Sequence, residues 1–181
     1  YTQPTSNKTL VQDILNHKID RAILAGSGDM SDILWENLKC PRYVFDRTML
    51  KGMEIAYHTP ETLGQDRLLN AYAVSHDFPN RNTLIVDCGT CITTTFLDEK
   101  NRLQGGSISP GVAMRFKALH HYTARLPLVA FDRAYHPSLL GMNTPSSIES
   151  GVLLGAIDEI VARMEAMRSL YPNLNIIMTG G

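Results

Sequence analysis

The stretch VDCGTCITTTF, residues 86–96, constrains the fold of this chain more than any other feature. An apolar segment ends at Asp87, Gly89 and Thr90 follow, and a run of β-branched residues then begins. Glycine permits a sharp turn, and β-branched residues favour strands. The pattern therefore predicts two strands, at 83–87 and 92–97, that are joined by a tight turn.

The segment after this hairpin extends it into an antiparallel meander. A polar turn, DEKNR, separates the second strand from a third strand that is predicted over 103–108. Earlier in the chain, segments with helical and strand periodicity alternate, with helices expected near 10–15, 31–38 and 67–76. Alternation is typical of parallel strands with crossover helices, whereas hairpins are typical of antiparallel sheets.

The change of pattern near residue 80 predicts a first domain at 1–80 and a second at 81–181. In the second domain, Ser109 and Pro110 are expected to open a helix that runs to about His121, because proline suits the first helical position. Ser146 and Glu149 have capping-box spacing and predict a long helix over 147–167. Its apolar face is expected to carry Ile148, Val152, Ile157, Ile160, Val161 and Met164. A last strand is expected in LNIIMTGG.

Charge and composition narrow the classes of protein. The net charge of −1 offers no electrostatic basis for binding nucleic acid or a membrane surface. No run approaches the roughly 18 apolar residues that a membrane helix needs. Three cysteines are too few for a disulfide framework, so a reducing cytoplasm is the expected location.

Cys88 and Cys91 form a C-x-x-C pair, which raises a metal-binding or redox alternative. A structural zinc site needs four ligands, yet the chain has only one further cysteine, Cys40, and His120 and His121 are adjacent. A redox C-x-x-C opens a helix, whereas a strand is predicted here. Packing in a partly buried turn is therefore the preferred interpretation of both cysteines.

A phosphate-binding turn is the main alternative to the dithiol. Successive N–H groups in a tight turn point toward one site, and the Thr90 hydroxyl adds a donor. Asp87, at the end of an apolar strand, is placed to hold a cation or simply to cap the turn. Gly105–Gly106 at the third strand and Gly180–Gly181 after the last strand complete a layout that resembles the actin-like ATPase superfamily.

Six segments together resemble one family of that superfamily, the type III pantothenate kinases. They occur in the order typical of the family and cover nearly all of residues 55–181, whereas the first 50 residues carry no signature. The segments are LGQDRLLNAYA, LIVDCGTCITT, GGSISPGVAMRFKAL, YTARLPLV, GMNTPSSIESGVLLG and IIMTGG.

The resemblance implies an α/β fold of two ribonuclease H-like (actin-like ATPase) domains with mixed sheets flanked by helices. It implies ATP-dependent phosphorylation of pantothenate to 4'-phosphopantothenate, the first step of coenzyme A synthesis. It also implies a homodimer that uses Mg²⁺ and a monovalent cation, K⁺ or NH₄⁺. A non-catalytic, nucleotide-binding regulatory homologue is the alternative function.

The resemblance also assigns residues. It implies that Asp66 is the general base and that Arg67 binds polar groups of the substrate. Further pantothenate contacts are implied for Tyr57, Gly64 and Gln65, and for Thr144 reaching across the dimer. Gly89 and Thr90 would contact ATP, and Asp87 would hold the monovalent cation.

The chain departs from the family pattern at its start. The family begins with a strand and a phosphate loop of the form D-x-G-N-T, and no such segment occurs in these 181 residues. We therefore expect that the first strands and this loop are missing from the first domain, and that the C-terminal end of the second domain is missing too.

Overall fold

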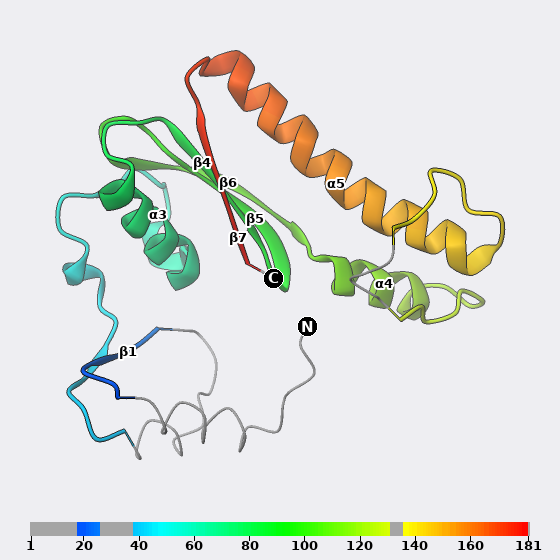
Figure 1. Cartoon of the computed structure of the whole chain (residues 1–181), viewed down its shortest axis with the longest axis horizontal. Coiled ribbons are helices and arrows are strands. Elements are labelled where there is room, and N and C mark those ends of the chain that lie inside the picture. The colour runs from blue at the N-terminus through cyan, green and yellow to red at the C-terminus, as the bar shows by residue number, and fades with distance from the viewer. Residues whose placement is uncertain (1–17, 26–37, 131–135, 181) are drawn as a thin grey trace.

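The computed structural model describes residues 18–25, 38–130 and 136–180, and it has a mixed α/β architecture (Figure 1). The helices expected near 10–15 and 31–38 fall largely or wholly outside the described residues, as does Gly181 of the final glycine pair. A small parallel sheet of β1 (Ala22–Leu24) and β2 (Arg42–Val44) lies apart from the main sheet.

The main sheet has five strands in the order β3-β6-β5-β4-β7. Its strands are β3 (Glu54–Ile55), β4 (Thr83–Cys88), β5 (Cys91–Leu97), β6 (Arg102–Pro110) and β7 (Asn175–Gly180). The β4, β5 and β6 strands form the predicted antiparallel meander, while β7 joins β4 in parallel and β3 joins β6 in parallel. The predicted meander and last strand are confirmed.

Helices cover both faces of this sheet. Two short 3-10 helices, η1 (Arg47–Met49) and η2 (Pro60–Thr62), lead into α3 (Gln65–Asp77). The side chains of β4 alternate between the faces: Ile85 packs in the cluster that includes α3, whereas Leu84 and Val86 pack with α5 (Thr144–Leu170). Burial on both faces accounts for the continuous apolar run of β4.

One hydrophobic core includes residues from both sides of residue 80. Its members before this position flank the two 3-10 helices or lie in α3, and those after it lie in the sheet; they are Phe45, Leu50, Leu63, Leu68, Ala71, Val74, Ile85, Leu97 and Leu103. A second cluster joins α4 (Val112–His121) to the first half of α5.

None of the helices in the described parts of the chain combines the length and apolar character needed to cross a membrane.

Two predicted helix starts are wrong. The helix expected from Ser109–Pro110 begins at Val112 with Gly111 as N-cap, because Ser109 and Pro110 still pair with β5 as the end of β6. The long helix begins at Thr144, and its capping box joins Asn143 and Ser146, not Ser146 and Glu149. Asn143 is among the strongest N-caps, and its side chain accepts from Ser146 N at 2.9 Å.

The predicted apolar face of α5 is only partly buried. Ile148 and Val152 are buried, and Ile160 and Met164 pack on the sheet, as expected. Ile157 and Val161, however, are 54% and 44% exposed. Apolar side chains therefore remain exposed along the middle of α5, between the half that packs on α4 and the half that packs on the sheet.

Candidate active site

Two segments that are separate in sequence meet at one end of the main sheet. The start of α3 lies at the same end as the β4–β5 turn, because α3 leads into β4 and β4 then runs back past it (Figure 1). Asn70 on α3 donates a hydrogen bond from Nδ2 to Asp87 Oδ2 on β4, at 2.9 Å. The structure therefore brings the G-x-D-R segment beside the D-x-G-T turn.

Asp66 stands in the first turn of α3 and is exposed. A Cβ atom at Gly64, the N-cap, would lie 2.4 Å from Asp66 Oδ1, so the absence of a side chain at Gly64 leaves room for the carboxylate. The helix N-terminus stabilises a negative charge at this position. Asp66 is thus a solvent-facing carboxylate that can accept a proton from a bound molecule.

Arg67 has the opposite environment and is only 4% exposed. Its Nε donates to Thr95 Oγ1 at 3.0 Å and its Nη2 donates to the Thr94 carbonyl at 3.2 Å, so β5 fixes the guanidinium. The Tyr57 ring lies over it, with 5.7 Å between Arg67 Cζ and the ring centroid. A Cβ at Gly106 would lie 1.7 Å from the Thr94 carbonyl oxygen and 2.9 Å from Nη2, so glycine is required there.

The β4–β5 turn presents Gly89 and Thr90 to solvent. Gly89 N donates to the Cys91 carbonyl and Gly111 N donates to the Thr90 carbonyl, both at 3.0 Å. A Cβ at Gly111 would lie 2.3 Å from the Thr90 carbonyl oxygen, so the turn rests directly on the N-cap of α4. This contact with α4 holds the turn in place, and the side of the turn that carries Gly89 and Thr90 stays open to solvent.

The Asp87 carboxylate is half-buried between three elements. Asp87 pairs with Thr93 of β5 on one side and with Thr179 of β7 on the other. Gly180, whose φ is +92°, lies so close that a Cβ there would be 2.6 Å from Asp87 Oδ1 and 2.7 Å from the Cys88 carbonyl oxygen. The end of β7 can therefore pack this closely against Asp87 only because residue 180 has no side chain.

Gln65 and Thr144 complete the set of predicted residues. Gln65 is half-buried and opens α3, next to Asp66. Thr144 is exposed at the start of α5, beside α4 and at the far side of the molecule from α3 (Figure 1). Within one chain, the structure does not bring Thr144 to Asp66.

The cysteines of the turn are reduced, and the environment of Cys88 opposes ionisation. Burial raises the pKa of the Cys88 thiol, and the neighbouring Asp87 carboxylate raises it further. Cys88 also packs against the Leu84, Val86 and Phe96 cluster. These features support packing as its role, because a reactive thiol needs a lowered pKa.

Two polar residues with long-range hydrogen bonds, one on α3 and one on α5, were not predicted from the sequence. Asn70 is one; its position four residues after Asp66, on the same helical face, was the available signal. The other is Glu159 of α5, which accepts from Ser109 Oγ at 2.6 Å and forms an ion pair with Arg115. The Ser109 hydrogen bond, followed by that of Arg115, lowers the pKa of Glu159. Long-range pairs of this kind have no local sequence signal.

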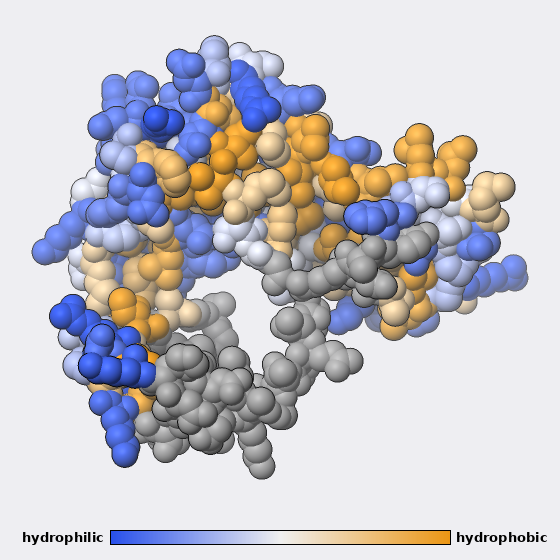
Figure 2. All heavy atoms as spheres, viewed as in Figure 1, coloured by the Kyte–Doolittle hydropathy of each residue, from blue (hydrophilic) through white to orange (hydrophobic). Residues whose placement is uncertain are grey.

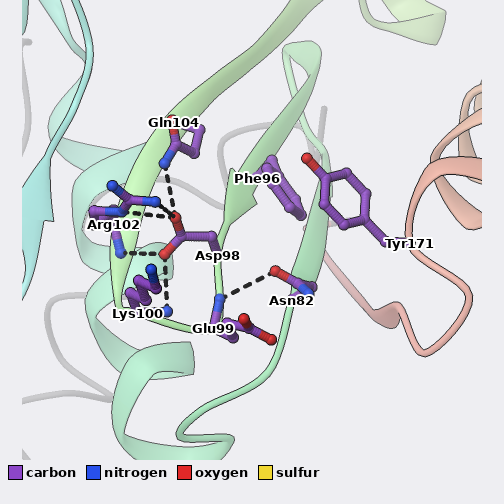
Figure 3. Close-up of a pocket in the computed structure, with 8 residues that line it drawn as sticks. All are labelled: Asn82, Phe96, Asp98, Glu99, Lys100, Arg102, Gln104 and Tyr171. Carbon is purple, nitrogen blue, oxygen red and sulfur yellow. Dashed lines mark hydrogen bonds and ion pairs between the residues drawn. The ribbon is translucent and has the colours of Figure 1, made fainter.

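A pocket of about 380 Å³ lies at the other end of the β4–β5 hairpin, away from these residues (Figure 3). Asp98 organises it by accepting hydrogen bonds from Arg102 Nε, Gln104 Nε2 and the backbone N–H groups of Lys100 and Arg102. Phe96 and Tyr171 form its apolar wall. The Asp98–Arg102 ion pair and these hydrogen bonds stabilise the β5–β6 turn.

A family model and curated proteins that match this chain carry the same description. The family model for type III pantothenate kinase matches residues 26–166. A type III pantothenate kinase of Flavobacterium psychrophilum is 38% identical over 183 residues, covering 97% of this chain and 75% of that protein. Another, of Flavobacterium johnsoniae, is 46% identical over 125 residues, covering 69% of this chain and 50% of that protein. The chain spans about half the length of several curated relatives that it matches.

A solved structure supports the fold. It is that of a conserved Campylobacter jejuni protein assigned to the Baf family of transcriptional activators, with a TM-score of 0.53 and 16% sequence identity. The match covers 92% of this chain and 80% of that one.

Proposed function

The chain belongs to the type III pantothenate kinase family, and we propose that the protein transfers the γ-phosphoryl group of ATP to pantothenate, the first step of coenzyme A synthesis in the cytoplasm. The observation that carries this proposal is the junction of α3 with the β4–β5 turn through Asn70 and Asp87. It places a solvent-facing carboxylate, Asp66, at the same end of the sheet as an open backbone turn. Phosphoryl transfer needs such an acceptor for a proton close to a site for phosphates.

Asp66 is the proposed general base. As the primary hydroxyl oxygen of pantothenate attacks the γ-phosphorus, its proton passes to the Asp66 carboxylate and ADP leaves. Gly64 gives the carboxylate room at the N-terminus of α3. A positioned base of this kind contributes about 10²–10⁴-fold to a rate.

The pantothenate pocket is proposed to lie over Tyr57, Gly64, Gln65 and Arg67. Arg67 has two donors committed to β5, so it holds a fixed orientation toward the substrate. The Tyr57 ring stacks on the guanidinium, and this contact helps to hold the ring in place. Preorganised polar groups of this kind lose little conformational entropy when they bind a ligand.

Gly89 and Thr90 are proposed to contact the ATP phosphates, with the exposed Thr90 hydroxyl as the donor, because the Gly89 N–H already donates to the Cys91 carbonyl. Mg²⁺ would accompany the nucleotide and neutralise its charge as the phosphoryl group is transferred. The monovalent cation, K⁺ or NH₄⁺, is proposed to bind at Asp87. Asp87 Oδ1, the Cys88 carbonyl and the Cys88 N–H all lie close beside Gly180, and the two oxygens are of the kind that bind such a cation.

A homodimer of two-domain subunits is the proposed assembly. Exposed apolar side chains gather along α5 and the end of β6, including Ile108 at 64%, Ile157 at 54% and Val161 at 44% (Figure 2). A second copy of the chain that covers α5 would bury this surface. It would also give Thr144 a route to the pantothenate pocket of the partner, which Thr144 cannot reach in its own chain.

The test compares Asp66→Asn with the unmodified protein, by ADP release with ATP, Mg²⁺ and pantothenate in potassium and in sodium. We expect the substitution to lower kcat by about 10²–10⁴-fold, because the amide cannot accept the proton. The melting temperature should change little, because the side chain is exposed.

Two results would contradict the proposal in different ways. Turnover of Asp66→Asn at the normal rate would remove Asp66 from the role of base. Failure of the folded, unmodified protein to release ADP in response to pantothenate would favour a non-catalytic, nucleotide-binding homologue.

A further inference from the structure

Asn70 lies between two proposed functional residues, Asp66 and Asp87, and has no role in the proposed mechanism. It lies one turn after Asp66 on α3, and residues four apart on a helix share a face. Its Nδ2 reaches across to Asp87 Oδ2 on β4, at 2.9 Å. One amide side chain therefore links the helix of the proposed base to the carboxylate of the proposed cation site.

The hydrogen bond determines how the Asp87 carboxylate is rotated. The terminal torsion of an aspartate is broad, so an unrestrained carboxylate samples many orientations. Here Oδ2 accepts from Asn70, and Oδ1 lies close to Gly180 of β7. No donor among the described residues reaches Oδ1. Oδ1 is thus the carboxylate oxygen that is available to a cation.

The chemistry of an amide suits this position. A lysine or arginine would pair with Asp87 and cancel the charge that attracts a cation, whereas a second carboxylate would repel Asp87. The amide is neutral, so it orients the carboxylate and leaves its charge available. Its reach across from α3 also connects Asp87 to the helix that carries Asp66.

We propose that Asn70 is a positioning residue that sets Asp87 for the monovalent cation and couples the cation site to the helix of Asp66. This inference rests on the proposed function. Loss of the Asn70 amide should weaken potassium binding while leaving the chemical step nearly intact once potassium saturates.

The experiment uses Asn70→Ala and Asn70→Leu, the latter close to asparagine in shape but without a donor. Asn82→Ala is the matched control, because Asn82 Oδ1 also takes part in one hydrogen bond, which it accepts from Glu99 N at 3.1 Å at the opposite end of β4. The first readout is the rise in melting temperature of the whole protein when potassium replaces sodium, without nucleotide. The second is the potassium concentration that gives half-maximal turnover.

Both Asn70 variants should need about tenfold more potassium for half-maximal turnover, as expected for losing one hydrogen bond to a charged group. Their stabilisation by potassium should fall in parallel, and kcat at saturating potassium should stay within about threefold of the normal value. Asn82→Ala should match the unmodified protein in both readouts.

Potassium dependence that is unchanged in the two Asn70 variants would overturn the inference, as would failure of both to fold, which would assign Asn70 to the core. The same holds if potassium has no effect on the unmodified protein in either readout. If potassium stabilises the unmodified protein but no pantothenate-dependent turnover occurs, the proposed function fails, and the melting readout alone decides the role of Asn70.

Discussion

At the scale of single residues, Asp66 and Arg67 show how neighbours in one motif differ in their physical roles. Consecutive helical residues point about 100° apart, so one can face solvent while the next faces the sheet. Asp66 is exposed at the helix start, whereas Arg67 is 4% exposed and bonded to β5. The motif therefore combines a proposed reactive group with the anchor that holds its helix in place.

Replacing Arg67 should destabilise the protein more than replacing Asp66. Arg67→Met keeps the length of the side chain but loses both hydrogen bonds to β5 and leaves the buried Thr94 carbonyl without its donor. We expect the free energy of unfolding to fall by about 2–3 kcal/mol, the range for hydrogen bonds from charged groups. Urea unfolding measures this, with Asp66→Asn as the neighbouring control. A loss below about 0.5 kcal/mol, the usual effect of a surface change, would contradict the anchoring role.

Replacing both turn cysteines should have little effect on the proposed activity. Cys88→Ser with Cys91→Ser preserves size, and neither the turn N–H groups nor the Thr90 hydroxyl changes. Because the pKa of Cys88 is raised, less of it is thiolate at neutral pH than in an ordinary cysteine, and iodoacetamide should alkylate it slowly. Pantothenate-dependent ADP release and alkylation rates measure both effects. Complete loss of activity in a well-folded double variant would reopen the dithiol alternative.

At the scale of elements, the sequence predicted the sheet better than the helix starts. The β4–β5–β6 meander has strong local signals: β-branched runs, a glycine turn and a polar turn. The bounds of α3 were also close, since its start follows Gly64 and its end precedes Pro79. Local chemistry is sufficient where strands and turns follow one another directly.

The helix starts depended on tertiary pairing and on competition between caps. Pro110 has no backbone N–H to donate, yet β6 still pairs through it, because it is the last residue of the strand. At α5, both Asn143 and Ser146 were suitable caps, and the reciprocal bonds between them favoured the earlier start. Arg67 could not be placed from sequence either, because its partners on β5 are 27 and 28 residues away.

The hydrogen bonds that Asp98 accepts in the β5–β6 turn should make the stability of the protein depend on pH. Burial alone would raise the pKa of Asp98, but hydrogen bonds from Arg102, Gln104 and Lys100 together lower it below 3.8. A lowered folded pKa stabilises the fold above the unfolded value and loses that effect as the pH falls through the folded pKa. Asp98→Ala should therefore cost about 1–2 kcal/mol at pH 7, and the difference should narrow below pH 3.8.

Urea unfolding of the two proteins across this pH range gives the comparison. Glu99→Ala is the control, because Glu99 is exposed in the same turn and contributes its backbone N–H rather than its side chain. A gap between Asp98→Ala and the unmodified protein that stays constant from pH 7 to below 3.8 would contradict the role of the ionised carboxylate.

At the scale of the whole molecule, the chain keeps its proposed catalytic residues in two places. Asp66, Arg67 and the Asp87–Thr90 turn lie together at one end of the sheet, while Thr144 lies at the outer end of α5 (Figure 1). Apolar side chains remain exposed between them on α5. Both observations have one explanation if α5 of one subunit packs on a partner and carries Thr144 to the partner's site.

Complementation between two inactive variants tests that arrangement directly. Asp66→Asn and Thr144→Ala homodimers should each be nearly inactive, because every site lacks one proposed group. If Thr144 acts across the dimer, each mixed dimer has one site with both defects and one site with none. Random pairing of equal amounts should then restore about a quarter of the normal activity, since half of the dimers are mixed.

Thr144 acting within its own chain would give a different result, because every site of a mixed dimer would still carry one defect and activity would not recover. Coexpression, followed by measurement of pantothenate-dependent ADP release, distinguishes the two. Mixing Asp66→Asn with Arg67→Met is the control, because both residues lie on α3 and, if they serve the same site of their own chain, no mixed site is intact. Recovery in the first pair and not in the second would require α5 to complete the partner's site.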